Sequence, residues 1–490
     1  MERFGAFIDN EVYLPRNGRY FPTENPATGQ PWAEVLDCAE ADVDAAVMSA
    51  DLAFRTGPWA TMLPHDRAEV LRNLADVSFA HAEELAVAET RDNGKLLVEM
   101  RAQCRYLKQW LHYYAGLADK IEGRVLPVDK ANTLVYTRRE PLGVVAAIVP
   151  WNSPLLLAVW KIAPALSAGN TVVIKPSEFT STSTLLLMQL WAKHLPKGVI
   201  NVVTGKGPTT GQLLVDHPKV RKIAFTGGEN AGISIGQAAI KRMVPVTLEL
   251  GGKSANIVFP DADLDNAVKG ACAGIFAASG QTCIAGSRLL LHREIADRFL
   301  EKFLGLAKSA RIGDPSDPQT QVGPVTTLAQ YERILGFIER TKAAGAELLL
   351  GGAACQSAGS GWFIEPTVFA QVTPDMEIWR KEVFGPVLAI STFETAQDAI
   401  ELANDVDYGL AAGIWTKDLI RAHRVAGNIE AGNVWINTYR TSAPQAPFGG
   451  YKMSGLGREG GQQAIEQYVE TKAVWVDMNS ECPNPFVMRL

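Results

Sequence analysis

Cysteine is scarce in this sequence: the 490 residues contain 6 cysteines, and no two of them form a C-x-x-C pair. So few scattered thiols cannot build the dense disulfide framework of a small secreted domain, and without paired cysteines a zinc ribbon is not expected. We therefore expect reduced thiols and no metal site. The cysteines are Cys38, Cys104, Cys272, Cys283, Cys355 and Cys482.

Long apolar runs and long basic runs are missing as well. The most apolar stretch, residues 142–160, is interrupted by two prolines and two polar residues, whereas a membrane span needs about 20 predominantly apolar residues. No basic segment followed by an apolar run opens the chain, so no secretory signal is predicted. The net charge is −6, which argues against a general nucleic-acid binder. We expect a soluble cytoplasmic protein that binds neither nucleic acid nor membrane.

The composition is that of an ordinary globular protein, with 47% hydrophobic and 20% charged residues. At about 150 residues per domain, the length corresponds to two or three domains. Apolar residues recur at helical spacing over 64–92, where Asn93-Gly94 supplies a stop, and a second helix is predicted over 96–121. Residues 133–139 alternate and predict an extended ribbon.

Short apolar strands alternate with helical segments from residue 143 onward. This alternation is typical of parallel sheets covered by helices on both faces. We therefore expect an α/β fold with two such domains joined near residue 250. The ribbon and a further strand over 468–477 lie outside these two sheets, and pairing across subunits would cover their edges. The strands predicted for the two sheets are 143–149, 170–174, 199–203, 222–225 and 245–250, then 254–258, 287–292, 387–391, 412–416 and 433–437.

Two segments carry side chains suited to nucleophilic and base chemistry. Cys283 lies between Gly280 and Gly286, whose backbone can approach closely and expose N–H groups beside a thiolate; a packed core cysteine is the alternative. Glu249 ends an apolar strand, where burial would raise its pKa and make it a usable base. Pairing with Lys253 is the alternative for this carboxylate.

Two further segments follow predicted strands, at the edge where open α/β sheets bind ligands. Asn152 lies between Pro150 and Pro154, so its amide is suited to stabilising an oxyanion; a turn asparagine is the alternative. Lys175 and Glu178 are suited to holding ribose hydroxyls, and a solvated loop is the alternative.

Glycines and a second acidic residue complete the nucleotide signals. Gly227 and Gly228 open a predicted helix that also contains Gly232, and a helix N-terminus suits a phosphate. Their spacing is not G-x-G-x-x-G, so this signal is weak by itself. Glu382 can contact a second ribose, and Phe384 can contact a ring.

Taken together and in this order, these segments resemble the NAD(P)-dependent aldehyde dehydrogenase family. Phe276, Gly280, Gln281 and Cys283 match the cysteine pattern of the family, and residues 248–253 match its glutamate pattern. The resemblance implies a Rossmann-like parallel-sheet cofactor domain (1–122 and 141–249) and an α/β catalytic domain (250–450). It also implies a small β oligomerisation unit (123–140 and 467–490), hence a homodimer or homotetramer.

The resemblance also implies a mechanism and roles for the site residues. Cys283 attacks an aldehyde to give a thiohemiacetal, Asn152 and the backbone N–H of Cys283 stabilise the oxyanion, and hydride transfer leaves a thioester. Glu249 then activates water, which releases a carboxylic acid. The implied cofactor is NAD, with NADP as the alternative. The implied cofactor-side residues are Trp151, Lys175, Glu178, Gly227, Gly228, Gly232, Gln330, Glu382 and Phe384, and the substrate-side residues are Trp160, Arg440 and Phe448.

Departures from the family pattern bear on the substrate. Small residues stand at four positions that are aromatic in many relatives, and Arg440 stands where some relatives have a carboxylate. We therefore expect a bulky, polar or acid-bearing aldehyde. Gly228 replaces a small polar residue, so the helix that it opens should be less well capped. The four small residues are Ser153, Ala273, Ala277 and Ser442.

Three other functions compete with this one. A relative that resolves the thioester with CoA would usually lack the glutamate found here as Glu249. A catalytically silent binding protein on the same scaffold would not need Cys283, Glu249 and Asn152 together. A cysteine hydrolase without a cofactor would need a Cys–His pair, and none is apparent among the 7 histidines.

Overall fold

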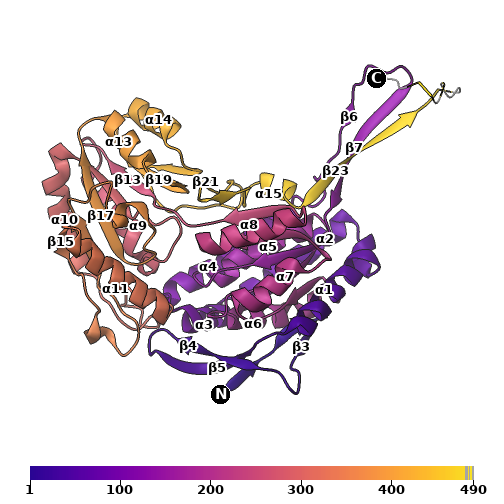
Figure 1. Cartoon of the computed structure of the whole chain (residues 1–490), viewed down its shortest axis with the longest axis horizontal. Coiled ribbons are helices and arrows are strands. Elements are labelled where there is room, and N and C mark those ends of the chain that lie inside the picture. Colours follow the sequence, from indigo (N-terminus) through magenta and orange to yellow (C-terminus); the bar gives the residue numbers. More distant parts are fainter. Residues whose placement is uncertain (480–483, 485, 488–490) are drawn as a thin grey trace.

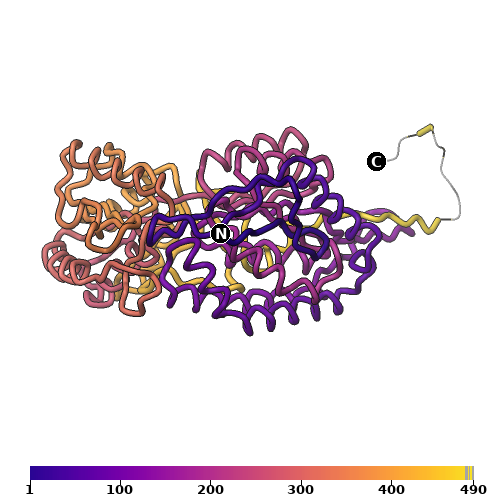
Figure 2. The backbone as a smooth tube through the Cα atoms, turned by 90° about the horizontal axis from the view of Figure 1, so that it is seen from below, coloured from indigo at the N-terminus to yellow at the C-terminus, as the bar shows by residue number. Residues whose placement is uncertain are grey.

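The computed structural model describes residues 1–479, 484 and 486–487. The described part of the chain forms two lobes side by side and a long β arm that projects away from the larger lobe (Figure 1). Turning the molecule by 90° keeps the lobes beside each other and the arm extended (Figure 2). Among the described residues, no helix is long and apolar enough to cross a membrane.

The larger lobe is built on an eight-stranded sheet of order β22-β12-β11-β8-β9-β10-β2-β3. Its five central strands are parallel, which confirms the strands predicted for this part of the chain. These strands are β8 Val144–Ile148, β9 Thr171–Lys175, β10 Ile200–Val202, β11 Val220–Thr226 and β12 Val246–Glu249.

Both faces of this sheet are apolar because both are covered by helices. On β8, Val145 and Ala147 pack into the core under α2, α4, α5 and α6, whereas Ala146 and Ile148 pack into the core under α1, α7 and α8. The helices of this lobe are α1 Glu40–Arg55, α2 Pro64–Ala80, α3 Ala82–Asn93, α4 Leu97–Ala115, α5 Pro154–Ser167, α6 Thr182–Trp191, α7 Gln212–Asp216 and α8 Glu229–Lys241.

The strand order places a topological switch point in this sheet. From β8 the chain adds β9 and β10 on one side and then β11 and β12 on the other. The loops that leave β8 and β11 therefore diverge, and open α/β sheets bind ligands in the crevice that such divergence creates. Residues 149–153 and 227–228 follow these two strands.

Short strands that the sequence did not predict lie at the edges of the larger lobe. β2 and β3 run antiparallel beyond β10, and β22, from the C-terminal part of the chain, pairs with β12. A separate three-stranded sheet has the order β1-β5-β4. These strands are β1 Glu2–Phe4, β2 Ala6–Ile8, β3 Glu11–Tyr13, β4 Tyr20–Asn25, β5 Gln30–Leu36 and β22 Gly455–Leu456.

The smaller lobe contains a seven-stranded sheet of order β15-β16-β17-β14-β13-β19-β20. All strands except β15 are parallel, and the five predicted for this block are confirmed, whereas β15 and β16 were missed. The strands are β13 Ala255–Val258, β14 Arg288–His292, β15 Glu347–Leu350, β16 Thr367–Ala370, β17 Val387–Phe393, β19 Ala411–Trp415 and β20 Asn433–Ile436, and β18 Tyr408–Gly409 pairs with β21 Tyr451–Lys452 beside them.

The remaining helices belong mainly to the smaller lobe (Figure 1). They are α9 Leu264–Phe276, α10 Ala296–Lys308, α11 Leu328–Ala343, α12 Glu377–Arg380, α13 Ala396–Asn404, α14 Leu419–Asn428 and the C-terminal α15 Gln463–Glu466.

Two predicted helix boundaries were wrong. The helical pattern over 64–92 is divided at His81 into α2 and α3. The sequence did not reveal this break, because a one-residue interruption leaves the apolar spacing on both sides intact. The helix predicted to reach residue 121 ends at Ala115, where Gly116 follows. The predicted stop is confirmed, since Gly94 caps α3 in the left-handed conformation with φ 73°.

The arm confirms the predicted ribbon and the C-terminal strand. β7 (Thr133–Pro141) pairs antiparallel with β23 (Val469–Asp477) along its whole length, and β6 (Val125–Leu126) pairs with the other edge of β7. Of the predicted segment 467–490, residues 480–483, which include Cys482, and residues 485 and 488–490 lie outside the described residues. The domain boundaries themselves stay predictions.

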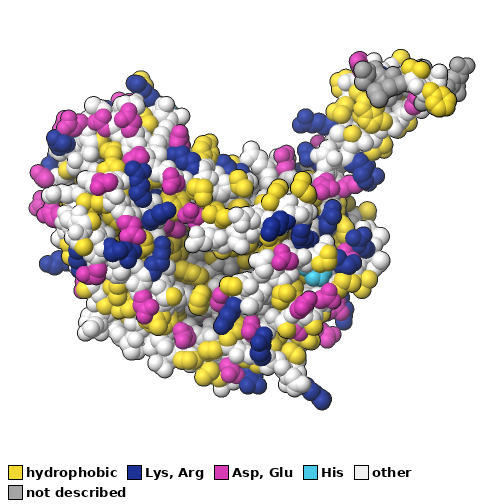
Figure 3. Space-filling model, in the orientation of Figure 1, with side chains coloured by type: hydrophobic (Ala, Val, Ile, Leu, Met, Phe, Trp, Pro, Cys, Tyr) yellow, Lys and Arg dark blue, Asp and Glu magenta, His cyan; other side chains and the backbone are white. Residues whose placement is uncertain are grey.

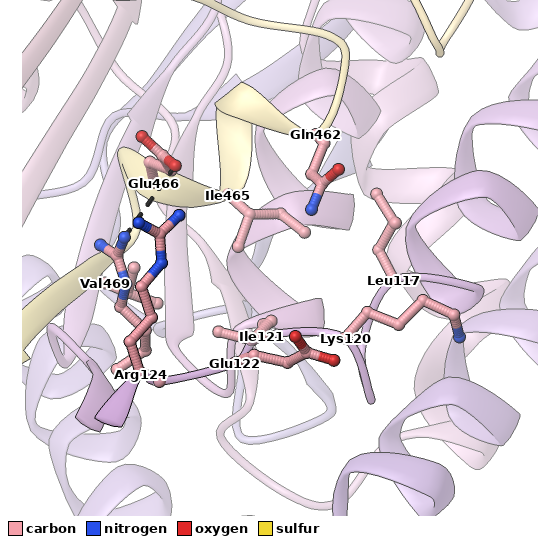
Figure 4. A pocket seen from close by; sticks show the side chains of 11 residues that line it. Leu117, Lys120, Ile121, Glu122, Arg124, Gln462, Ile465, Glu466 and Val469 are labelled. Carbon is pink, nitrogen blue, oxygen red and sulfur yellow. Dashed lines mark ion pairs between the residues drawn. The ribbon is translucent and has the colours of Figure 1, made fainter. Parts of the chain in front are cut away.

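A pocket lies where the arm joins the larger lobe, and Arg124, Ile465 and Glu466 are among its lining residues (Figure 4). An ion pair between Arg139 and Glu466, 4.0 Å apart, crosses it. None of the predicted site residues lines this pocket.

Candidate active site

The loop that carries Cys283 is strained and closely packed. It follows α9 through a 3₁₀ turn, Ala277–Gly280, in which Ala278 and Ser279 both have φ 53°. Non-glycine residues rarely adopt this conformation, which persists only where the surroundings enforce it and which clusters at functional sites. At Gly280 an added Cβ would lie 2.1 Å from the carbonyl oxygen of Gly385. The loop therefore presses against the segment that carries Glu382 and Phe384.

Gln281 fixes this loop between two parts of the chain. The Asn152 amide Nδ2 donates to the Gln281 carbonyl oxygen at 3.0 Å. The Gln281 side chain donates to the Pro324 carbonyl at 3.3 Å and accepts from the Thr326 amide at 2.9 Å. The geometry thus brings Asn152 to the loop of Cys283, and residues 323–326 are a support that sequence reasoning missed.

Glu249 lies at the end of β12, next to the same loop. Its side chain is 3% exposed, and neither carboxylate oxygen has a hydrogen-bond partner among the described residues. Burial raises the pKa of Glu249 well above its ordinary value, and the nearby Glu459 raises it further. An added Cβ at Gly252 would lie 2.9 Å from the Cys283 carbonyl oxygen, so the loop after Glu249 touches the cysteine.

The alternative pairing of Glu249 with Lys253 is wrong. Lys253 Nζ is buried without a partner among the described residues, and burial lowers its pKa to about 7. The cations that lower the pKa of Glu249 are Lys161 and Arg458 instead.

The thiol of Cys283 is held mainly in its protonated form. Burial raises its pKa to about 12, and the charges of Glu382 and Glu249 raise it further. The backbone N–H groups of Cys283 and Ile284 act in the opposite direction. These two amides therefore favour the thiolate, but burial and the two carboxylates outweigh them, so the net pKa of Cys283 is raised.

A buried ion pair beside Glu249 was not predicted. Lys161 of α5 forms a short hydrogen-bonded ion pair with Glu459, and its Nζ also donates to Thr226 Oγ1 at 2.6 Å. Both charged side chains are nearly inaccessible. A lysine in the middle of an otherwise apolar helix was the one available signal for Lys161, whereas Glu459 is remote in sequence.

Trp151, in the loop that follows β8, contacts Phe384. Their rings are in edge contact, with centroids 5.2 Å apart. Phe384 has φ 58°, and the Gln330 side chain holds it by donating to the carbonyl oxygens of Val383 and Phe384 at 2.8 and 3.0 Å. Gln330, predicted to face a cofactor, here acts on the loop that carries Phe384.

Glu382 closes over the loop that follows Glu249. Its Oε1 accepts from the Gly252 amide at 3.1 Å, and an added Cβ at Gly251 would lie 2.2 Å from its Oε2. Burial raises the pKa of Glu382 to about 7.

The predicted ribose and phosphate segments follow β9 and β11, the two strands that flank β8. Lys175 Nζ lies 3.5 Å from Glu178 Oε2 after β9. Gly228 precedes α8 without a side-chain cap, as expected. Gly232 has a packing role, because an added Cβ would lie 2.4 Å from Leu250.

Two of the predicted substrate-side residues pack together. Trp160 stacks on Trp110 with ring centroids 4.4 Å apart and meets Phe448 edge-on at 5.1 Å. Arg440 contributes differently, since its Nη1 donates to the Ala273 carbonyl at 3.0 Å. Burial lowers the pKa of Arg440, whereas the charge of Glu99 raises it.

Space-filling representation shows a hollow between the two lobes (Figure 3). Among the described residues, no group of three or more His, Cys, Asp or Glu side chains is arranged to hold a metal ion. The site thus combines a cysteine, an amide and a buried carboxylate with two strand ends suited to a nucleotide.

Comparison with known proteins gives concordant results. The model of the aldehyde dehydrogenase family matches residues 13–474. An Acinetobacter baylyi (Z)-2-((N-methylformamido)methylene)-5-hydroxybutyrolactone dehydrogenase is 44% identical, covering 100% of both chains. An aldehyde dehydrogenase of Enchytraeus buchholzi is 46% identical over 96% of this chain and 95% of its own.

Solved structures agree over nearly the whole chain. An NAD⁺ complex of aldehyde dehydrogenase from Bacillus cereus is 42% identical with a TM-score of 0.95, covering 98% of this chain and 97% of that one. A betaine aldehyde dehydrogenase from Staphylococcus aureus in complex with NAD⁺ is 38% identical with a TM-score of 0.96, covering 99% and 97%. This chain belongs to the aldehyde dehydrogenase family.

Proposed function

We propose that this protein oxidises an aldehyde to the carboxylic acid with NAD, through a covalent intermediate on Cys283 that Glu249 resolves. The observation that carries the proposal is the meeting of three elements: Asn152 bonded to the cysteine loop, Cys283, and Glu249 buried beside that loop with no hydrogen-bond partner among the described residues. The test is growth of NADH absorbance with a panel of aldehydes in the absence of CoA, together with identification of the free acid.

The residues present fit a dinucleotide. An added Cβ at Gly228 would meet nothing within 4 Å, so the uncapped N-terminus of α8 has room for a phosphate. Lys175 and Glu178 would hold the adenosine ribose, and Glu382 the nicotinamide ribose. NAD would supply the hydride acceptor. The likeness to NAD⁺ complexes of two relatives supports this assignment.

In the first half of the reaction, the thiol of Cys283 must lose its proton, because only the thiolate is a competent nucleophile. Its sulfur then bonds to the carbonyl carbon, and the carbonyl oxygen becomes an oxyanion. We expect the Asn152 amide and the backbone N–H of Cys283 to stabilise that charge, and the contact of Asn152 with the cysteine loop supports this role. Loss of hydride leaves a thioester on the sulfur.

In the second half, Glu249 takes a proton from water, which attacks the thioester carbon and releases the acid and the thiol. A buried carboxylate with a raised pKa is a better proton acceptor than an exposed one, once it is deprotonated. The ion pair of Lys161 and Glu459 lies behind it, so Glu249 is surrounded by charges of both signs.

The cofactor preference is expected to depend on Glu178. Its carboxylate would accept hydrogen bonds from the 2′ and 3′ hydroxyls of NAD and repel the 2′-phosphate of NADP. Glu178→Ser removes the charge, and we expect the ratio of kcat/KM for NAD over NADP to fall by about tenfold. Steady-state kinetics with both cofactors measure this. Comparable kcat/KM values for both cofactors in the unaltered enzyme would contradict the preference.

The substrate is proposed to be bulky, polar or acid-bearing. Arg440 uses one N–H on Ala273, and its other donors have no partner among the described residues, so they remain for a substrate carboxylate. Among acetaldehyde, a long aliphatic aldehyde, benzaldehyde and succinic semialdehyde, acetaldehyde should not have the highest kcat/KM. Arg440→Ala should lower the succinic semialdehyde value about tenfold or more.

Exposed Arg424 offers the matched control, and Arg424→Ala should leave all four values unchanged. If acetaldehyde is the best of the four, the wide-site hypothesis is wrong. If Arg440→Ala leaves succinic semialdehyde unchanged, the charge-pairing hypothesis is wrong.

A second copy of the chain is the proposed partner of the arm. Apolar side chains are exposed along its strands, among them Val125, Leu134 and Trp475, and Figure 3 shows this apolar surface away from the lobes. Unpaired sheet edges are normally covered. A homodimer or homotetramer would cover them, and a cytoplasmic location stays a prediction from the sparse cysteines.

A further inference from the structure

The turn between α3 and α4 is wedged beneath the cysteine loop. It begins with Gly94 and Lys95, directly after Asn93, the last residue of α3. An added Cβ at Gly94 would lie 2.7 Å from the Pro324 side chain, and Thr326 Oγ1 donates to the Asn93 carbonyl at 2.6 Å. Pro324 and Thr326 are the residues that hold Gln281, so the turn supports the cysteine loop from below.

Lys95 presents a buried charge to the other side of the site. Its side chain is 3% exposed, and its Nζ donates to Ser153 Oγ at 3.0 Å. No carboxylate of the described residues lies within ion-pair distance of it. Burying an ammonium group against a single hydroxyl is costly. Ser153 directly follows Asn152, so Lys95 restrains the segment that carries the amide.

Glu99 lies in the first turn of α4 and bonds to the cysteine loop, whereas Lys95 directly precedes Leu96, the N-cap of this helix. Glu99 Oε1 accepts from the Ala278 amide at 3.1 Å. Its other oxygen, Oε2, is buried without a partner among the described residues. Ala278 is one of the two strained residues before Cys283. A half-satisfied buried carboxylate is unfavourable for stability alone, and such a feature requires another explanation.

We propose that Lys95 and Glu99 are a pair of positioning residues that set the separation between the Asn152 amide and Cys283. The segment before α4 holds the amide segment through Lys95 and Ser153, and the first turn of α4 holds the strained cysteine loop through Glu99 and Ala278. The proposal rests on the proposed function, because it assigns both residues to the oxyanion and nucleophile of that reaction.

The charges around this turn favour a second effect of Lys95. Burial lowers the pKa of Lys95 to about 8 and Arg440 lowers it further, whereas Glu99, Glu89 and a Cys283 thiolate raise it. Because such coupling is mutual, we expect protonated Lys95 to favour the Cys283 thiolate. Glu249 and Glu382 oppose this from the other side. Loss of the cation should therefore slow reactions of the thiol.

Two matched pairs of variants separate positioning from packing. Glu99→Gln keeps an oxygen acceptor for Ala278, whereas Glu99→Ala removes it. Lys95→Arg keeps the cation, whereas Lys95→Met removes it. Lys108 on α4, which is partly exposed and pairs with Asp76, gives the control Lys108→Met. The measurements are kcat and KM with the best aldehyde, thermal midpoints, and the rate at which iodoacetamide alkylates Cys283 between pH 6 and 9, followed by peptide mass spectrometry.

For Lys95, we expect Lys95→Met to slow alkylation of Cys283 about tenfold, the effect of one pKa unit, with Lys95→Arg and Lys108→Met close to the unaltered protein. Lys95→Met and Ser153→Ala should also be non-additive in kcat, since the lysine acts through the serine. Equal alkylation rates in Lys95→Met and Lys95→Arg, or additive effects with Ser153→Ala, would overturn this half of the proposal.

For Glu99, we expect Glu99→Ala to lower kcat about 10- to 100-fold with little change in KM and to change the alkylation rate at least threefold. Glu99→Gln should recover most of both. Equal kcat values and equal alkylation rates in Glu99→Ala and Glu99→Gln would contradict the proposed role of Glu99 as the acceptor for the Ala278 amide. Alkylation of Cys283 does not require an aldehyde. If the unaltered protein fails to reduce NAD with every aldehyde tested, the proposed function is refuted, but the alkylation rates still decide whether Lys95 and Glu99 position the site.

Discussion

Replacing Cys283 by serine is expected to lower kcat for aldehyde oxidation by about three orders of magnitude or more, with NAD binding retained. An unactivated hydroxyl is a far weaker nucleophile at neutral pH than a thiolate. Among the described residues, no histidine is hydrogen-bonded to Cys283, and the charges of Glu382 and Glu249 raise rather than lower the pKa of this group. Stopped-flow or steady-state NADH absorbance measures the loss, and quenching of tryptophan fluorescence measures NAD binding.

Cys272 provides the matched control for this experiment. It lies on α9, eleven residues before Cys283, is partly buried, and packs against the core of the smaller lobe. Cys272→Ser should leave turnover within about twofold, as for a substitution outside the site. Substantial turnover by Cys283→Ser would contradict the assignment of the nucleophile, and an equal loss in both variants would show that the effect comes from folding.

The residues proposed to act directly on substrate could be predicted from the sequence, because each stands in a short local pattern. Cys283 is flanked by glycines, Glu249 ends an apolar strand, and Asn152 lies between prolines. The structure brings these segments together through contacts that a local pattern also indicates, such as the close approach of Gly252 to Cys283. Their catalytic roles nevertheless stay predictions until they are tested.

The residues that act on these three could not be predicted in the same way. Glu459 pairs with Lys161 although 298 positions separate them, and Glu99 meets Ala278 across 179 positions. Nothing in the residues around Glu459 or Glu99 distinguishes them from ordinary surface carboxylates. Only the folded chain shows that Glu459 is buried, that Glu99 is partly buried, and that one oxygen of each has no hydrogen-bond partner among the described residues.

Dependence on contacts remote in sequence also distinguishes the missed strands from the predicted ones. The central parallel strands carry apolar residues on both faces, so their composition reveals them. β2, β3 and β22 are two or three residues long and exist because they extend an edge that the central strands have already formed. Such strands depend on a partner and not on their own pattern.

Replacing Glu249 by glutamine is expected to separate the two halves of the reaction. Oxidation to the thioester does not need this carboxylate, so the variant should release NADH in a burst near one per active site. Turnover should then be slowed about 100-fold or more, because no base activates the water. Rapid mixing of enzyme, NAD and the best aldehyde, followed at the absorbance of NADH, measures both phases.

The pH dependence of turnover provides an independent check that Glu249 acts in its deprotonated form. Glu249 works as a base only when deprotonated, and burial raises its pKa. Turnover of the unaltered enzyme should therefore fall as the pH drops through this raised pKa, and Glu249→Gln should lose that dependence. Added hydroxylamine, which attacks a thioester without a general base, should restore turnover in Glu249→Gln but not in Cys283→Ser. A steady rate like that of the unaltered enzyme, with no burst, would show that another group activates the water; a slow rate that hydroxylamine cannot raise would place the defect before the thioester forms.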